Sequence, residues 1–328
     1  MKLINEDFWK GKKVFITGGA GFVGSHLVEK LKSVGAYVSG LGHFSEPKTQ
    51  EGIYGDLTST VDSRRMERYL NSFKPEIIFH LAAQPIVNYA EELLKDTYNV
   101  NVIGTLNLFT AIRHLDSVQS IVHISTDKVY GNLPVITEES IPNGVEHSYN
   151  ASKLCGDIIA QNFGHMFNLP VTIIRNGNAY GAGDNHYERI IPNTFKRLIT
   201  NQPVVIRGNG SMLRDYIHVS EIVIGYMNAC YAGWEYKKRP IVDILRLGST
   251  RPYPVTEVID TVIKVSKKVG SVSFKQEVEL KGEIPNQHII DLETQRYIGW
   301  YPETTLEMGL ELTYPYYNKL FAKVETVK

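Results

Sequence analysis

The amino-acid sequence predicts an α/β fold, a doubly wound parallel sheet with a smaller mixed lobe toward the C-terminus. Three observations lead to this fold class. Over about the first half of the chain, short apolar runs alternate with helical patterns, which is typical of parallel strands joined by helices. A glycine-rich stretch separates the first apolar run from the first helical pattern. With 328 residues, the chain is long enough to form two lobes.

The predicted elements follow one another regularly along the chain. Residues 12–19 (KKVFITGG) are expected to form a buried strand, and residues 24–35 a helix that ends at a glycine. Residues 36–42 follow as a second strand. Three later apolar runs and two long periodic segments complete the pattern: strands at 75–83, 119–126 and 170–178, and helices at 91–115 and 148–167.

Gly18, Gly21 and Gly24 lie in the stretch TGGAGFVG, between the first strand and the first helix. A pyrophosphate binds to backbone N–H groups at a helix N-terminus, where a Cβ would collide with it. The stretch therefore predicts a dinucleotide site of the Rossmann type, with Phe22 and Val23 as further cofactor-binding residues. A purely structural turn is the alternative.

The end of the second strand normally separates NAD from NADP, because an acidic residue there binds the ribose 2′-hydroxyl and a basic one accepts a 2′-phosphate. The stretch here is SGLGHFSEP, with neither an obvious Asp nor an Arg, and His43 is the candidate contact. NAD is the expected cofactor, and NADP remains open. Asp56 and Leu57, in YGDL, are candidates for contact with the adenine ring, although an Asp after a strand can equally form a turn.

The division into lobes follows from a change of pattern after about residue 180, where Gly, Asn and Pro become frequent. Residues 1–180 are expected to form the dinucleotide-binding domain, with 216–247 returning to it. The substrate-binding lobe is assigned to 181–215 and 248–328.

The composition excludes several classes of protein. Thirty-five basic residues balance thirty-five acidic ones, so that nothing favours a nucleic acid or an anionic membrane as partner. Cys155 and Cys230 are the only cysteines and lack metal-like spacing, which fits a reducing compartment. Without an apolar signal core or a run of transmembrane length, we expect a cytoplasmic protein. His80, His123 and His218 follow apolar runs and are expected in the core, and no metal site is predicted.

The catalytic candidates begin where a buried strand ends. Thr126, Asp127 and Lys128 lie at this point, and open α/β sheets bind ligands at this edge. Tyr149 and Lys153 are four residues apart and so share one face of a helix. A lysine ammonium lowers the pKa of a neighbouring phenol from about 10, so that the tyrosine can take a proton from a hydroxyl while a nicotinamide accepts hydride. A surface turn and an exposed helix pair without chemistry are the alternatives.

With these motifs in the same order along nearly the whole chain, the sequence resembles the extended short-chain dehydrogenase/reductase family, which acts on nucleotide sugars. The stretches that carry the resemblance are TGGAGFVG, GDL, HLAAQ, NVIGT, STDKVYG, YNASK and RNGNAYG. The resemblance implies a tightly bound NAD, a nucleotide-sugar substrate, and a homodimer built on the two long helices. It implies Thr126, Tyr149 and Lys153 as core catalytic groups, and four further cofactor-binding residues: Leu81, Ala82, Ala83 and Asn101.

Within this family the chain is most similar to the sugar-nucleotide 4,6-dehydratases, above all to the CDP-glucose type, in FWKGKKVFITG, FKPEIIFHLAAQPIV and GAGDNHYERIIPN. These enzymes oxidise C4, lose water across C5 and C6, and return the hydride to C6. A protonated Asp127 suits donation to the leaving C6 hydroxyl, and a neutral Lys128 suits removal of the C5 proton. This assignment requires that burial penalise the Asp–Lys ion pair.

Alternatives remain open within the family. A 4-epimerase needs only Thr126, Tyr149 and Lys153, and GGAGFVG and RDYIHV look epimerase-like. STDK also resembles the UDP-N-acetylglucosamine 4,6-dehydratases, which place their tyrosine nearer to the acid–base pair. The dTDP-glucose dehydratases carry Glu at the position of Lys128, which disfavours that substrate. A cofactor-sensing protein without turnover is disfavoured because the catalytic set is complete.

Five residues are candidates for substrate binding. Gln84 is one of them, and Asn178, in RNGNAYG, matches the substrate-facing Asn of the family, with a turn residue as the alternative. Arg189, Arg207 and Arg214 fall in the expected substrate lobe, and the planar guanidinium suits a diphosphate because it donates two parallel hydrogen bonds. Each arginine can equally be a solvated surface charge.

Overall fold

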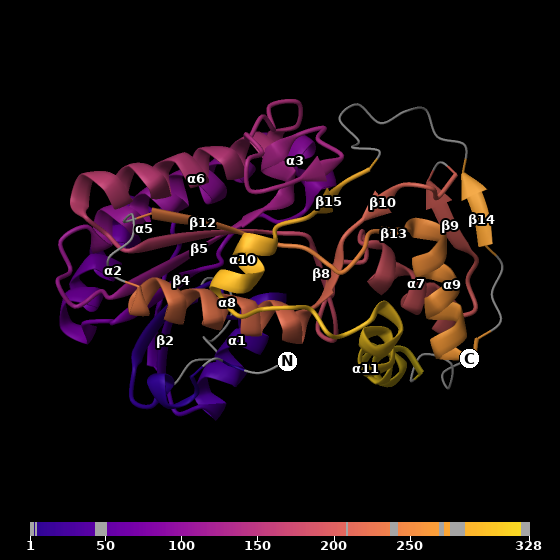
Figure 1. Ribbon diagram of the computed structural model, residues 1–328, viewed down its shortest axis with the longest axis horizontal. Coiled ribbons are helices and arrows are strands. Elements are labelled where there is room, and N and C mark those ends of the chain that lie inside the picture. The colour runs from indigo at the N-terminus through magenta and orange to yellow at the C-terminus, as the bar shows by residue number, and fades with distance from the viewer. Residues whose placement is uncertain are drawn as a thin grey trace.

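The computed structural model describes residues 3, 5–42, 51–207, 209–236, 242–268, 272–275 and 286–322. Its centre is a parallel sheet of seven strands in the order β12-β7-β5-β4-β1-β2-β3 (Figure 1). This arrangement confirms the predicted fold class. The strands are β1 (Lys13–Thr17), β2 (Tyr37–Gly42), β3 (Glu51–Tyr54), β4 (Ile77–His80), β5 (Ser120–Thr126), β7 (Val171–Asn176) and β12 (Val242–Leu247).

Both faces of the sheet are covered because its strands are apolar on both sides. Alternate side chains of β1 point to opposite faces: Val14 and Ile16 join one core cluster, and Phe15 joins another. Helices α1 (Phe22–Ser33) and α8 (Val219–Glu235) cover the first face. The second face is covered by α2 (Thr60–Phe73), α5 (Thr105–Ile112) and α6 (Ser148–Phe167), and Figure 1 shows the two layers on opposite sides of the sheet.

The helix expected at 91–115 is interrupted, which corrects that prediction. The chain forms α3 (Val87–Glu92), α4 (Leu94–Tyr98), a π-helical segment η2 (Asn99–Gly104) and then α5. Leu93 leaves the helical region with φ −109° and ψ 51°, which separates α3 from α4. In η2 one extra residue is fitted into the turn, so hydrogen bonds span five residues rather than four. The periodicity of the apolar residues does not reveal this local insertion.

A third core lies beyond the carboxyl edge of the sheet. Helices α7 (Ile190–Ile199), α9 (Val255–Ser266) and α11 (Leu306–Phe321) pack around the buried rings of Phe195 and Tyr317. Figure 1 shows these helices on the right-hand side of the view, away from α2, α5 and α6. The boundaries of the two lobes remain our proposal. Among the described residues, no helix combines the length and the apolar character needed to cross a bilayer.

Short strands connect this third core with the sheet. They pair as β8 (Asn178–Tyr180) with β11 (Tyr216–His218), β9 (Val204–Arg207) with β14 (Val272–Lys275), β10 (Leu213–Arg214) with β13 (Tyr253–Pro254), and β6 (Val135–Ile136) with β15 (His288–Ile289). The remaining elements are η1 (Asp7–Trp9), η3 (Asp127–Tyr130) and α10 (Leu292–Tyr297).

His80, His123 and His218 are all buried, as the sequence predicts. His218 is the N-cap of α8, and its Nδ1 accepts a hydrogen bond from the backbone N–H of Ser220. Burial, together with the charge of His26, lowers the pKa of His218 to about 4. The cap therefore depends on an unprotonated ring.

His218 should make the fold sensitive to acid. The unfolded chain takes up a proton on this ring near pH 6.5, whereas the folded chain takes it up near pH 4. Stability should therefore be lost as the pH falls from about 6.5 toward 4. We expect His218→Asn, which keeps a capping side chain but does not titrate, to lose about 2 kcal/mol less unfolding free energy than wild type between pH 7.5 and 4.5.

Denaturant unfolding at the two pH values measures this difference. His165→Asn, at an exposed histidine of α6, is the matched control and should behave as wild type. An equal loss of stability in wild type and His218→Asn would contradict the assignment.

Candidate active site

The carboxyl ends of β1, β4 and β5 open into one cavity of about 1500 Å³. Parallel strands direct these ends to the same edge of the sheet, which is where such folds bind ligands. Segments of both the sheet region and the third core line the cavity. Site residues that the sequence predicts in three separate stretches therefore line the same cavity.

The glycines of the loop after β1 allow the chain to pack closely against its own backbone. Gly18 has φ +74°, a conformation that side chains disfavour, and a Cβ on Gly24 would lie 2.1 Å from the carbonyl oxygen of Gly18. Helix α1 begins at Phe22 and presents its first backbone N–H groups to the cavity, which Gly21, Phe22 and Val23 also line. These N–H groups suit a pyrophosphate.

The stretch YGDL shows both features that the sequence predicts for it, a position at the cavity and a turn. Asp56 and Leu57 line the cavity, while Asp56 Oδ1 also accepts a hydrogen bond from the backbone N–H of Thr58 at 2.8 Å. The carboxylate thus shapes its own turn. His43 lies outside the described residues.

The side chain of Asn101 holds the loop after β4 in place through hydrogen bonds to its backbone. Leu81, Ala82 and Ala83 line the cavity, whereas Asn101 is buried and is not among the lining residues. Its Oδ1 accepts from the backbone N–H of Gln84 at 2.8 Å, and its Nδ2 donates to the carbonyl of Gln84 at 3.2 Å. The structure therefore shows that Asn101 positions this loop, and its contact with the cofactor stays a prediction.

The side chain of Gln84 is tied to its own loop. It lines the cavity, but its Nε2 donates to Thr97 Oγ1 at 2.9 Å and to the carbonyl of Ile86. A substrate contact by this amide would compete with those hydrogen bonds.

Tyr149 and Lys153 both line the cavity from α6, as their spacing predicts. Burial lowers the pKa of Lys153 to about 8, and its Nζ donates to the carbonyl of Ile124 at 2.6 Å. Burial raises the pKa of Tyr149 to about 12, which the charge of Arg189 offsets only in part. The sequence predicts that Lys153 lowers the pKa of Tyr149. The pKa is raised instead, because burial has the largest effect on it.

Asp157 is a residue that the sequence analysis missed. It lies four residues after Lys153 on α6, fully buried, with Oδ2 2.9 Å from Arg175 Nε and Oδ1 3.4 Å from His123 Nε2. Burial favours its neutral form, but the close contact with His123 and the charge of Arg175 keep its pKa below the usual value. The spacing of Tyr149, Lys153 and Asp157 at i, i+4 and i+8 was the available signal.

Asp127 and Lys128 form an ion pair at the end of β5. Lys128 Nζ lies 2.8 Å from Asp127 Oδ2, and Thr126 Oγ1 donates to Asp127 Oδ1 at 2.9 Å. Thr126 and Lys128 line the cavity, and the carboxylate of Asp127 is buried directly behind them. Burial lowers the pKa of Lys128; the charge of Asp127 opposes this effect, and that of Arg214 adds to it.

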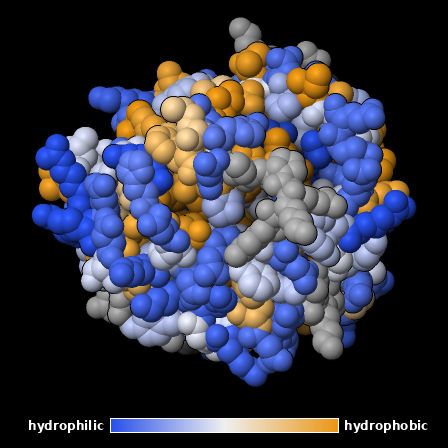
Figure 2. Space-filling view, turned by 60° about the vertical axis from the view of Figure 1, so that its left-hand side comes forward, coloured by the Kyte–Doolittle hydropathy of each residue, from blue (hydrophilic) through white to orange (hydrophobic). Residues whose placement is uncertain are grey.

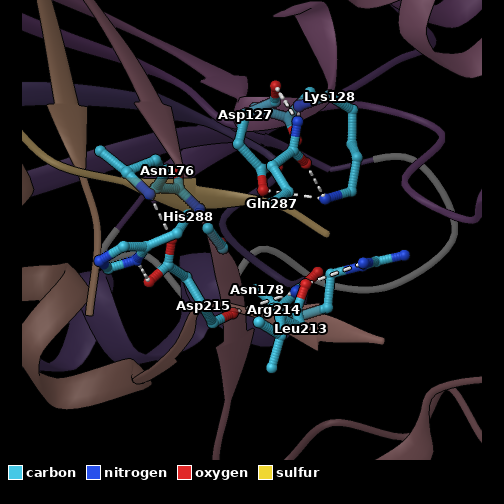
Figure 3. Close-up of polar contacts among 12 residues, drawn as sticks. Asp127, Lys128, Asn176, Asn178, Leu213, Arg214, Asp215, Gln287 and His288 are labelled. Atoms are coloured by element: carbon cyan, nitrogen blue, oxygen red, sulfur yellow. Dashed lines mark hydrogen bonds and ion pairs between the residues drawn. The ribbon is translucent and has the colours of Figure 1, made fainter. Parts of the chain in front are cut away.

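Gln287 is the second residue that the sequence did not reveal. It comes from the segment before β15 and contacts Lys128, as Figure 3 shows. No motif or periodicity marks it, because the contact joins residues 159 positions apart.

The substrate candidates lie on the far wall of the cavity. Asn178, Arg189 and Arg214 all line it. Asn178 Nδ2 donates to the carbonyl of Asp215 at 3.0 Å, and Arg189 Nη1 lies 3.1 Å from Asp184 Oδ2. Arg207 ends β9, but its side chain is not described. Within the described ranges, no three His, Cys, Asp or Glu side chains gather to hold a metal.

A glycine loop, polar strand ends and a Tyr–Lys helix around one cavity define a Rossmann-type enzyme for a dinucleotide and a second ligand. Residues 14–238 match the NAD dependent epimerase/dehydratase family, and the chain belongs to this family. Membership confirms the predicted family, the enzyme class and the nicotinamide cofactor.

Three similar proteins illustrate the range of this family. CDP-glucose 4,6-dehydratase of Salmonella typhimurium is 36% identical over 69% of this chain and 68% of that protein. The structure of UDP-glucose 4-epimerase of Thermotoga maritima with UDP-glucose has a TM-score of 0.83 at 25% identity, covering 94% of this chain and 99% of that one. MoeE5 in complex with UDP-glucose and NAD has a TM-score of 0.84 at 26% identity, with the same coverage.

Gly24→Ala should abolish tight binding of NAD, since the new methyl group would meet the carbonyl oxygen of Gly18 at 2.1 Å and displace the loop. Gly19→Ala is the matched control in the same loop, because a Cβ there meets only side-chain carbons at 3.4 Å. Dinucleotide released from each purified variant on denaturation measures retention. Full retention in Gly24→Ala would contradict the cofactor site.

Proposed function

We propose that the protein is a nucleotide-sugar 4,6-dehydratase with tightly bound NAD, acting on CDP-glucose. The observation that carries this proposal is the buried Asp127–Lys128 pair beside Thr126 at the end of β5, of which Lys128 lines the same cavity as Tyr149. An epimerase has no use for this pair. The similarity to a CDP-glucose 4,6-dehydratase supports the choice of substrate.

The first step falls to the residues of β5 and α6. Bound NAD supplies a hydride acceptor and donor, and its positive ring lowers the pKa of a neighbouring phenol. Tyr149 then takes the proton of the C4 hydroxyl, and Thr126 orients that hydroxyl. Lys153 adds positive charge behind the phenolate while its Nζ remains anchored to the carbonyl of Ile124.

The second step falls to the acid–base pair. Lys128 accepts the C5 proton, and Asp127 donates a proton to the departing C6 oxygen, so that water leaves. The ion pair seen in the structure corresponds to the state after this step. Before it, Lys128 must be neutral and Asp127 must carry the proton that leaves with the C6 oxygen. Burial lowers the pKa of Lys128, which favours its neutral form before the step. In the last step the hydride returns to C6 while Lys128, after exchange with solvent, gives a proton to C5. Asp127 then regains a proton from solvent.

The arginines are proposed to bind the nucleotide diphosphate. Arg189 and Arg214 line the cavity and Asn178 lies with them, so that two guanidinium groups and an amide can share the phosphate oxygens. We include Arg207 among the residues proposed to bind the diphosphate because of its position in the sequence.

A 4-epimerase is the second candidate. Thr126, Tyr149 and Lys153 alone suffice for it, and the fold matches that of an epimerase at a TM-score of 0.83. Because the hydride leaves and returns at the same carbon, an epimerase would incorporate no solvent proton at C5.

We also propose a cytoplasmic homodimer. Ile103, Leu106, Ile158 and Met166 are exposed on η2, α5 and α6, where a second copy would cover them. In Figure 2 hydrophobic groups gather toward the top of the view, the side on which Figure 1 has α3 and α6. The balanced charge and the two unpaired cysteines support the location.

Incubation with CDP-, UDP- and dTDP-sugars in deuterated water tests the reaction. We expect a 4-keto-6-deoxy product from CDP-glucose, with deuterium at C5 and no added cofactor consumed. Mass spectrometry and proton NMR of the product measure both. C4 epimers without deuterium would replace the dehydratase by the epimerase.

Asp127→Asn should slow elimination by about 100-fold or more, because the amide cannot protonate the leaving oxygen. Oxidation at C4, followed in a single turnover as absorbance of the reduced nicotinamide, should persist. Asp116→Asn, at an exposed aspartate after α5, is the matched control. Normal elimination by Asp127→Asn would show that another group is the acid.

A further inference from the structure

Gln287 is a buried side chain, 1% exposed, that reaches the acid–base pair from the C-terminal part of the chain. Its Oε1 accepts a hydrogen bond from Lys128 Nζ at 2.5 Å. Its Nε2 donates to the carbonyl oxygens of Asp127 at 3.2 Å and of Gly131 at 3.3 Å (Figure 3). Because carbonyl oxygens only accept, the amide nitrogen must lie on their side and the amide oxygen must face Lys128.

The backbone around Gln287 is held as firmly as its amide. The N–H of Gln287 donates to the carbonyl of Leu213 at 3.0 Å, and the N–H of Leu213 donates to Asn286 Oδ1 at 3.1 Å. On the other side, the N–H of His288 donates to the carbonyl of Pro134 at 3.0 Å. Gln287 is therefore fixed between β10 and the chain that enters β6.

These contacts determine the direction in which Lys128 can accept a proton. The tetrahedral nitrogen is bonded to Cε and contacts two acceptors, Asp127 Oδ2 at 2.8 Å and Gln287 Oε1. A neutral amine donates its two hydrogens to these acceptors, which leaves its lone pair in the one remaining direction. Lys128 is also one of the residues that line the cavity.

The same arrangement separates the roles of the two carboxylate oxygens. Oδ2 of Asp127 receives a hydrogen from Lys128, so the proton of the acid belongs on Oδ1, which lies 2.9 Å from Thr126 Oγ1. Acid and base can therefore coexist in one buried pair without exchanging their proton along the contact that joins them.

We propose that Gln287 is a positioning residue of the dehydration step, which holds the Lys128 amine with its lone pair toward C5 of the sugar. This inference rests on the proposed dehydratase function. Glutamine is the side chain that meets all the contacts: glutamate lacks the N–H groups for the two carbonyls, methionine has no strong acceptor for Lys128, and asparagine is one methylene too short.

Gln287→Met tests the inference with a side chain of similar size. We expect the rate of elimination from CDP-glucose to fall by about 100-fold, the scale on which a misplacement of ~1 Å acts, with little change in KM. C4 oxidation in a single turnover should stay at the wild-type rate, and deuterium at C5 should appear correspondingly slowly. Gln119→Met is the matched control, since Gln119 Oε1 also accepts from a lysine, Lys12, on the opposite edge of the sheet.

Gln287→Glu adds a readout that a purely structural role would not move. The charged groups facing Lys128 are Asp127, Arg214 and Asp215, and a further carboxylate would favour the ammonium. Elimination requires a neutral Lys128, so its rate falls at low pH. In Gln287→Glu this fall should lie about one pH unit or more higher than in wild type. Bound NAD in each variant verifies that it folds. Should Gln287→Met not fold, Gln287→Glu decides.

The outcomes separate this inference from the function on which it rests. Wild type that forms no 4-keto-6-deoxy product would reject the proposed function. Wild type that forms it, together with variants whose elimination rate and pH profile are unchanged, would reject the role of Gln287 alone. A parallel fall of C4 oxidation and elimination in both folded variants would likewise reject it in favour of general support of the site.

Discussion

The arrangement of the active cavity depends on one buried carboxylate. Asp215 is fully buried, and its Oδ1 accepts hydrogen bonds from the N–H and the hydroxyl of Ser249 and lies 2.9 Å from His288 Nδ1. Its Oδ2 accepts from the N–H of Ile289 at 2.7 Å, and its carbonyl accepts from Asn178. Figure 3 shows these contacts side by side. An uncompensated loss of the carboxylate would leave several buried donors without acceptors, which is costly.

Asp215 holds together parts of the chain that are far apart in the sequence. Asp215 follows Arg214 directly, and the segment that it fastens contains Gln287. The groups proposed to bind the diphosphate and the residue proposed to orient the base therefore share one support.

The extent to which the site could be predicted follows from the range of each interaction. The glycine loop, the strand end at Thr126 and the Tyr149–Lys153 face are local patterns, and each lies where the sequence places it. Gln287 and Asp215 act through contacts between residues far apart in the chain, which periodicity and motifs do not encode. The raised pKa of Tyr149 was likewise hidden, because it arises from burial by the assembled fold.

The π-helical segment η2 changes the direction in which the side chains of α5 point relative to those of α4. Residues 99–104 accommodate one residue more than a regular helix would, and Asn101 within them reaches the loop after β4. Each residue of an α-helix turns the chain by about 100°, so the loss of a single residue here would rotate everything on one side of the segment relative to the other. The length of this stretch is thus constrained as strongly as its chemistry, because the loss of one residue would dislodge the loop that Asn101 supports.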